Sequence, residues 1–177
     1  MRSILSFLGV KAEAKSTDSD TIRRIASELD RLDPDRARYI AAFAFVLSRI
    51  AHADHEVSDE EIAAMERLVR EKGHLPEEQA VLVVQMAKTQ QVLFGGTDDF
   101  LVTRELRRVA SYEDKVALID CLFAVAAADS KILASEADEI GRTARELRVE
   151  QKDLSRLRSA YREHLVVRRG LADADPS

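Results

Sequence analysis

The strongest constraint on the fold of this chain is an internal repeat with an offset of 75 residues. The stretches FVLSRIAHADHEVSDEE and CLFAVAAADSKILASEADE align with each other at this offset. The pattern Ala-x-Ala-Asp recurs, with Asp54 matched to Asp129, and a glutamate follows seven residues later in each copy, Glu61 and Glu136. A unit of this length is too long for the common solenoid repeats, so the sequence predicts two copies packed as one pseudo-twofold body.

Composition and hydrophobic spacing predict an all-α fold. Apolar residues recur at steps of three and four along most of the chain, and no stretch alternates as a strand would. Only 5% of the 177 residues are aromatic, and 6 Gly and 3 Pro leave little material for the many turns of a β protein. We therefore expect a single-domain bundle of about seven to eight helices with an internal pseudo-twofold repeat.

The two ends of the chain are expected to lie outside the helical domain. We predict a flexible or docking leader over 1–19, the domain over 20–166 and a disordered tail over 167–177. The leader contains an apolar run from Ile4 to Val10, which is too short to span a bilayer and marginal for a signal peptide. The prediction is a cytoplasmic protein whose leader docks on the domain or touches the inner face of the membrane.

Several helix boundaries can be predicted from capping residues. Side chains that accept hydrogen bonds from a first turn mark the predicted starts: Asp33 before Pro34, Ser58 with Glu61 three residues later, Ser111 with Asp114, and Ser135. Gly73 is predicted to end the helix that Ser58 begins.

The acidic turns allow two interpretations. Local capping accounts for Ser58 and Glu61 completely. In the second copy the predicted cap is Ser135, so the cap shifts by two residues while the Asp-to-Glu spacing stays the same. The Asp-to-Glu spacing is the same in both copies although the predicted position of the cap is not, which favours a role for the carboxylates themselves. Local capping remains the alternative interpretation.

The second interpretation is a cation site. If folding brings the two turns together, four carboxylates repel one another unless a cation lies among them. The candidate metal ligands are Asp54, Glu61, Asp129 and Glu136, and oxygen ligands favour Ca²⁺, Mg²⁺ or Mn²⁺ over Zn²⁺. The segment DHEVSDEE is not an EF-hand, because it lacks the glycine and the spacing of that loop.

The two stretches AHADHEVSDEEIAAMERLV and AVAAADSKILASEADEIGRTA resemble the paired acidic signatures of the tellurite-resistance TerB family. The resemblance covers roughly 20–166. It implies an all-α, non-enzymatic domain linked to tellurite resistance and stress responses, with divalent-cation binding by the same four acidic residues. The glycine that commonly follows the family's aspartate is His55 in one copy and Ser130 in the other, and a Cβ there restricts the turn.

Other function classes have weaker support from the sequence. The net charge of -5 disfavours a nucleic-acid binder. The partners that the resemblance implies are other proteins of a stress-response complex. His52 and His55 lack the partners of a zinc site, and Cys121 lies in an apolar run typical of a buried residue. A metal-free protein-interaction module is the alternative function. A metal-dependent hydrolase is a third hypothesis, although no sequence pattern marks a nucleophile or a phosphate-binding loop.

Overall fold

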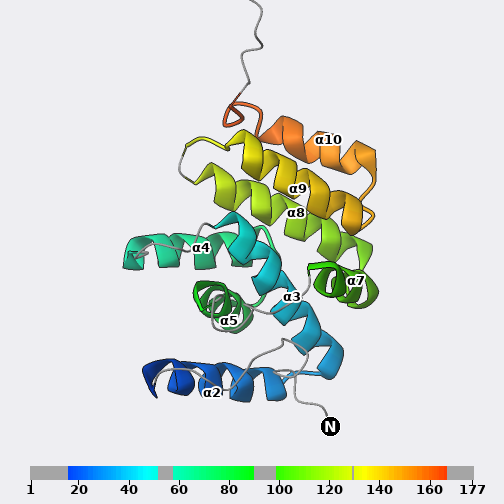
Figure 1. Ribbon diagram of the computed structural model, residues 1–177. Helices are drawn as coiled ribbons and strands as arrows, with labels where there is room; N and C mark the ends of the chain where they lie inside the picture. The colour runs from blue at the N-terminus through cyan, green and yellow to red at the C-terminus, as the bar shows by residue number, and fades with distance from the viewer. Residues whose placement is uncertain (1–15, 52–57, 90–98, 129, 167–177) are drawn as a thin grey trace, which may run out of the picture.

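The computed structural model describes residues 16–51, 58–89, 99–128 and 130–166, and Figure 1 shows their arrangement. Within these ranges the chain forms a bundle of helices with no strand, which confirms the predicted fold class. The helices are α2 (Ser16–Asp30), α3 (Pro34–Ile50), α4 (Asp59–Glu71), α5 (Glu77–Lys88), α7 (Asp99–Val109), α8 (Tyr112–Ala127), α9 (Ala134–Glu146) and α10 (Gln151–Ala160).

The predicted duplication is present in the helix boundaries. Adding 75 to the bounds of α4 gives the bounds of α9, and the same offset places α3 on α8 and α5 on α10 to within a few residues. Each copy is therefore a buried helix, an acidic segment, a second helix and a third helix. The predicted start of the domain at residue 20 falls inside α2, which lies outside the repeat.

The first helix of each copy forms the centre of the bundle. α3 packs against α5, α7, α8 and α9, and it crosses the middle of the molecule in Figure 1. Its alanines and large apolar residues are almost all buried, and the same is true of α8. Phe43 on α3 and Phe123 on α8 are fully buried, and each contributes about 2–3 kcal/mol by leaving water.

The capping residues begin their helices as predicted in three cases. Asp33 accepts hydrogen bonds from the backbone N–H groups of Asp35 and Arg36, with Pro34 at the first helical position. Reciprocal capping boxes join Ser58 with Glu61 at the start of α4 and Ser111 with Asp114 at the start of α8.

Gly73 follows the end of α4 as predicted, but for a different physical reason. The residue with a left-handed φ is His74, at 55°, and Gly73 itself lies outside that region. A Cβ built on Gly73 would lie 2.5 Å from the carbonyl oxygen of Val69 and 2.9 Å from Cζ of Phe43. The glycine is needed because the chain passes directly over the buried Phe43 ring.

No helix in the described ranges is long and apolar enough to cross a membrane. The leader residues up to 15 and the tail from 167 lie outside these ranges, so the predictions about them stay untested.

Replacing each of the two described glycines by alanine should have opposite effects on stability. Gly73→Ala should lower the free energy of unfolding by about 2 kcal/mol, because the new methyl group overlaps backbone and a buried ring. Gly141→Ala in α9 meets its nearest atoms at 3.5 Å and 3.8 Å, so it should raise stability by about 0.5–1 kcal/mol through helix propensity. Urea unfolding of both variants checks this. A Gly73→Ala protein as stable as the wild type would contradict the close-approach explanation.

Candidate functional site

The structure describes two of the four predicted cation ligands. Glu61 and Glu136 lie in described segments, at the third position of α4 and of α9. Asp54 and Asp129 lie outside the described residues, as do His52 and His55. The gathering of four carboxylates in one place therefore stays a prediction. In the part of the chain that the structure covers, no three His, Cys, Asp or Glu side chains form a group that could hold a metal ion.

Glu61 forms hydrogen bonds within the first turn of its own helix. One of its carboxylate oxygens, Oε2, accepts a hydrogen bond from the backbone N–H of Ser58 at 2.8 Å, and its own N–H donates to Ser58 Oγ at 3.2 Å. The hydrogen bond that the carboxylate accepts from the Ser58 backbone lowers the pKa of Glu61 below its ordinary value of 4.5, and a side-chain interaction with Ser58 lowers it further. The side chain is exposed, so its second oxygen stays accessible to a ligand.

Glu136 makes the same bond in the second copy, and this corrects the predicted capping register. Its Oε2 accepts from the backbone N–H of Leu133 at 2.7 Å. The N-cap of α9 is Leu133, not Ser135, which is the second residue of the helix. Leu133 and Ser58 are 75 residues apart, so the register does not shift between the copies. The prediction that the cap shifts by two residues while the carboxylate spacing stays the same is therefore wrong.

The error has a clear physical source. Sequence rules look for an oxygen at the N-cap, and leucine has none, so the serine two residues later becomes the apparent cap. In the structure the cap is only half formed, because Glu136 bonds the N-cap backbone while no side chain bonds back to the helix. Leu133 nevertheless adopts the extended backbone of an N-cap, with φ -67° and ψ 154°.

Ser130 occupies the position where the family pattern has glycine, and its backbone is left-handed, with φ 71°. A side chain in this region costs about 1–2 kcal/mol relative to glycine, so the surroundings must hold it there. Its N–H donates to the Ala127 carbonyl at 2.9 Å, and its own carbonyl accepts from Nδ1 of His164 at 3.2 Å. The second acidic turn thus retains the glycine-like bend without the glycine.

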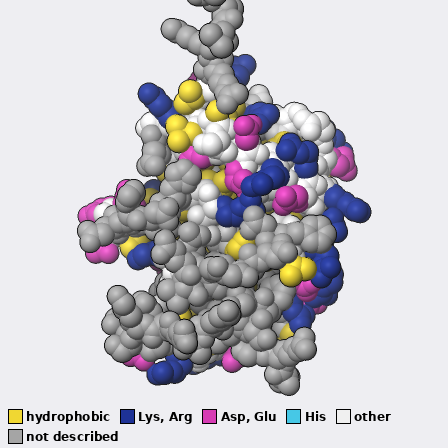
Figure 2. Space-filling model, viewed as in Figure 1, with side chains coloured by type: hydrophobic (Ala, Val, Ile, Leu, Met, Phe, Trp, Pro, Cys, Tyr) yellow, Lys and Arg dark blue, Asp and Glu magenta, His cyan; other side chains and the backbone are white. Residues whose placement is uncertain are grey.

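The segment after α10 supports this turn from outside. The N–H of Ile132 donates to the His164 carbonyl at 2.7 Å, and the N–H of Val166 donates to the Ile132 carbonyl at 3.1 Å. Ile132 is fully buried, whereas Leu133 and Val166 are 48% and 45% exposed. Figure 2 shows apolar side chains gathered at this upper end of the molecule, where α9 begins.

An ion pair ties the two halves of the repeat together. Arg49, at the end of α3, pairs with Glu139 in α9, and Glu139 also pairs with Arg142. Both partners of the first pair are largely buried, at 15% and 19% exposure. The segment leading to Asp54 is thereby joined to the helix that carries Glu136. Sequence reasoning missed this pair because the repeat gives no signal for it: the positions equivalent to Arg49 and Glu139 are alanines.

Two further contacts join the halves away from the turns. Lys72 lies 3.6 Å from the Asp120 carboxylate, which also accepts from the hydroxyl of Tyr161 at 2.8 Å. Cys121 is fully buried, as predicted, with its Sγ 3.8 Å from the Leu68 carbonyl. Burial raises the pKa of the Cys121 thiol, so it behaves as a packing residue between α8 and α4.

Comparison with known proteins gives one match. The family model described as tellurite resistance protein TerB matches residues 39–159, which is more than half of the chain and includes both acidic turns. No curated protein and no solved structure matched the chain.

The assignment of Leu133 as the N-cap of α9 predicts how substitutions at 133 and 135 change stability. Leu133→Ser should complete the capping box of α9 and raise the free energy of unfolding by about 0.5–1 kcal/mol, since the leucine is half exposed. Ser135→Ala should leave stability unchanged or slightly higher, because alanine is the better helix former within the first turn. Thermal and urea unfolding measure both. A clear loss of stability in Ser135→Ala would restore Ser135 as the cap.

The hydrogen bonds of Glu61 predict a pH dependence of stability. Its pKa is lowered in the folded protein, so its contribution is complete above about pH 4.5 and is lost as the pH falls through the folded value. In Glu61→Gln the amide oxygen can accept the same bonds without titrating. Between about pH 5 and pH 3 the wild type should lose stability faster than this variant.

Glu60→Gln is the control for the pH experiment. Glu60 lies on the same turn of α4, and within the described chain its carboxylate makes no hydrogen bond. This variant should follow the wild-type pH profile in the same urea titrations. Identical profiles for the wild type and Glu61→Gln would refute the assigned role of the Glu61 carboxylate.

Proposed function

Because the chain belongs to the family of the tellurite resistance protein TerB, we propose that it is a non-enzymatic helical scaffold of a cytoplasmic tellurite-resistance or stress-response complex. In this proposal a divalent cation binds at the paired acidic turns and partner proteins recognise the resulting arrangement of the two halves. The observation that supports it most is the common register of the two copies. Glu61 and Glu136 occupy the same helical position, each directly after an acidic segment.

The contacts between the halves support a shared response. The Arg49–Glu139 pair fixes the end of α3, which precedes the Asp54 segment in the chain, against α9, which follows the Asp129 segment. Carboxylates brought together there repel one another, and a divalent cation would remove that repulsion. The relative position of the two halves would then depend on whether the ion is present.

The glutamates fit such an ion even while they cap their helices. Each uses Oε2 for the backbone bond, and a carboxylate has further lone pairs on both oxygens. Ca²⁺, Mg²⁺ and Mn²⁺ all prefer oxygen ligands of this kind. Glu61 and Glu136 would hold the ion together with Asp54 and Asp129, and the ion would supply positive charge without taking part in a reaction.

A metal-free interaction module is the second candidate, and one observation favours it. Both glutamates already have a local structural task, because each satisfies an N–H group at the start of its own helix. The scaffold role would then rest on the helical surface alone. The two candidates differ in whether the aspartates bind an ion.

A calcium titration distinguishes these candidates. We expect millimolar Ca²⁺ to raise the unfolding temperature of the wild type, since a ligand that binds only the folded state stabilises it. Asp54→Asn and Asp129→Asn should each abolish most of this shift. Asp30→Asn, which makes the same charge change at the exposed end of α2, should keep it. Mg²⁺ and Mn²⁺ are titrated in parallel by calorimetry.

The glutamates are tested by a substitution that preserves capping. Gln at positions 61 and 136 can still accept the backbone hydrogen bond, so the double variant Glu61→Gln, Glu136→Gln should fold with similar stability. If the carboxylates hold a cation, its calcium response should fall as in the aspartate variants. A full response in the double variant would leave the glutamates with capping alone, and no response in the wild type would favour the metal-free module.

A further inference from the structure

Residues 161–166, which we call the strap, follow α10 and return to the beginning of α9, as the orange-red segment of Figure 1 shows. Two backbone hydrogen bonds, from Ile132 to His164 and from Val166 back to Ile132, form a short parallel β-bridge. The imidazole of His164 adds a third contact, from Nδ1 to the Ser130 carbonyl at 3.2 Å. Since a carbonyl only accepts, Nδ1 must carry the proton for this bond.

The start of the strap is anchored to α8 through Tyr161. Its ring stacks on the fully buried Phe123 with 5.6 Å between the ring centroids, and its hydroxyl donates to the Asp120 carboxylate at 2.8 Å. Near the other end, Leu165 packs against the hydrophobic core. The strap therefore connects α8, which precedes the second acidic turn, with the bridge at Ile132, which follows that turn.

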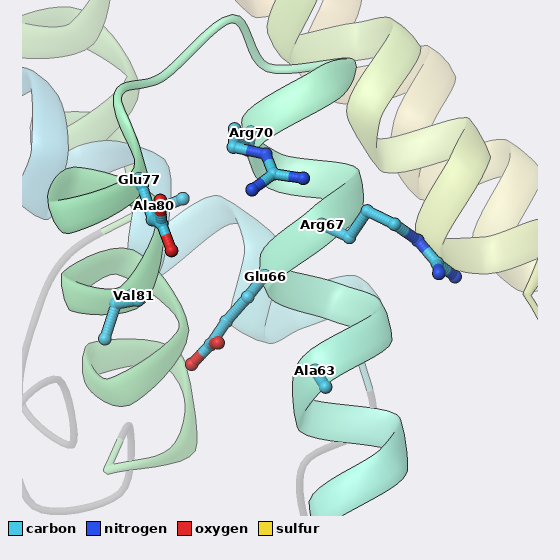
Figure 3. Close-up of a pocket in the computed structure, with 7 residues that line it drawn as sticks. All are labelled: Ala63, Glu66, Arg67, Arg70, Glu77, Ala80 and Val81. Atoms are coloured by element: carbon cyan, nitrogen blue, oxygen red, sulfur yellow. The ribbon is translucent and has the colours of Figure 1, made fainter.

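The equivalent residues of the first copy make no such strap within the described chain. Subtracting 75 from 161–163 gives 86–88, which still belong to α5. Thr89, the equivalent of His164, donates from Oγ1 to the Gln85 carbonyl of its own helix at 2.7 Å. α5 also packs against α4, and Figure 3 shows these two helices side by side, whereas α10 packs mainly against α8. The third helix of each copy is thus supported differently.

Ser130 is the residue whose conformation depends most on the strap. Its φ of 71° is unfavourable for a residue with a Cβ. The bend is held on one side by the hydrogen bond from its N–H to Ala127 and on the other by the contact of its carbonyl with His164. Two residues later, both backbone groups of Ile132 are bonded to the strap. Loss of the strap would remove the contacts on the second side of the bend.

We propose that the strap is a conformational device that controls the second acidic turn. The docked strap holds the left-handed bend at Ser130 and fixes Ile132 before α9. When the strap is released, Ser130 relaxes toward ordinary backbone angles and the start of α9 loosens. The proposal rests on the proposed function only for what the turn binds: Ser130 directly follows Asp129, so the strap would regulate cation binding there. Cation binding and strap docking should then strengthen each other by the same factor.

The first experiment uses the full chain with a chelator present. Val166→Pro removes the N–H that donates to Ile132 and leaves the rest of the strap in place. Hydrogen exchange of the Ile132 amide should become about fivefold to tenfold faster, as expected for one lost hydrogen bond. The amide chemical shifts of residues 130–133 should change at the same time. Val166→Ala, which keeps the N–H, is the matched control and should keep the wild-type exchange rate and shifts.

Ser130→Gly distinguishes control of the bend from simple packing of the strap. Glycine adopts the left-handed conformation without a Cβ, so the bend no longer needs support. In the double variant Ser130→Gly, Val166→Pro, the amide shifts of Leu133 and Glu136 should return to those of Ser130→Gly alone. His164→Ala should change the same shifts as Val166→Pro, because it removes the contact with the Ser130 carbonyl.

Unchanged shifts at residues 130–133 in Val166→Pro, or no restoration by Ser130→Gly, would overturn the proposal. Calcium is then added to the same variants. It should slow exchange of the Ile132 amide in the wild type, and Val166→Pro should bind calcium about fivefold more weakly, with affinity restored by Ser130→Gly. Equal calcium affinity in the wild type and Val166→Pro would refute the regulation of the site. No calcium response in any variant would refute the cation function alone, because the chelator experiments establish the strap independently.

Discussion

The burial of α3 and α8 is the constraint on which the rest of the structure depends. Both helices are apolar around nearly their whole circumference, so neither can expose a face to water. Each must be covered on all sides, and α4, α5, α7, α9 and α10 provide that cover.

The duplication determines how the two copies pack against each other. α3 and α8 are equivalent helices that pack against each other, and α3 also contacts α9. The Arg49–Glu139 pair then holds the end of one copy against the second helix of the other. Breaking a largely buried pair by removing one partner leaves an uncompensated charge, which makes this contact a specific link between the halves.

Much of this architecture could be predicted from the sequence, because the signals were local or repeated. Helical periodicity gave the fold class, and capping residues such as Ser58 and Ser111 gave helix starts. The predictions that failed share one cause, because the contact that determines each residue's role depends on the three-dimensional structure. Leu133 serves as an N-cap through its backbone and the Glu136 side chain, and Gly73 is required by the Phe43 ring rather than by its own φ angle. The residues at these positions are a leucine and a glycine, and neither residue type reveals the contact that determines its role.

The electrostatics at the N-termini of α4 and α9 show on which of the four acidic residues the cation hypothesis depends. The positive end of a helix carries about half an elementary charge, so two such ends oppose a cation with roughly one positive charge in total. Glu61 and Glu136 alone would leave about one net negative charge, much of it already engaged by backbone N–H groups. Adding Asp54 and Asp129 would bring the net charge to about three negative, enough to hold a divalent ion against the dipoles. The glutamates establish the register of the two copies, and in the proposed site the affinity for a cation would depend on the aspartates.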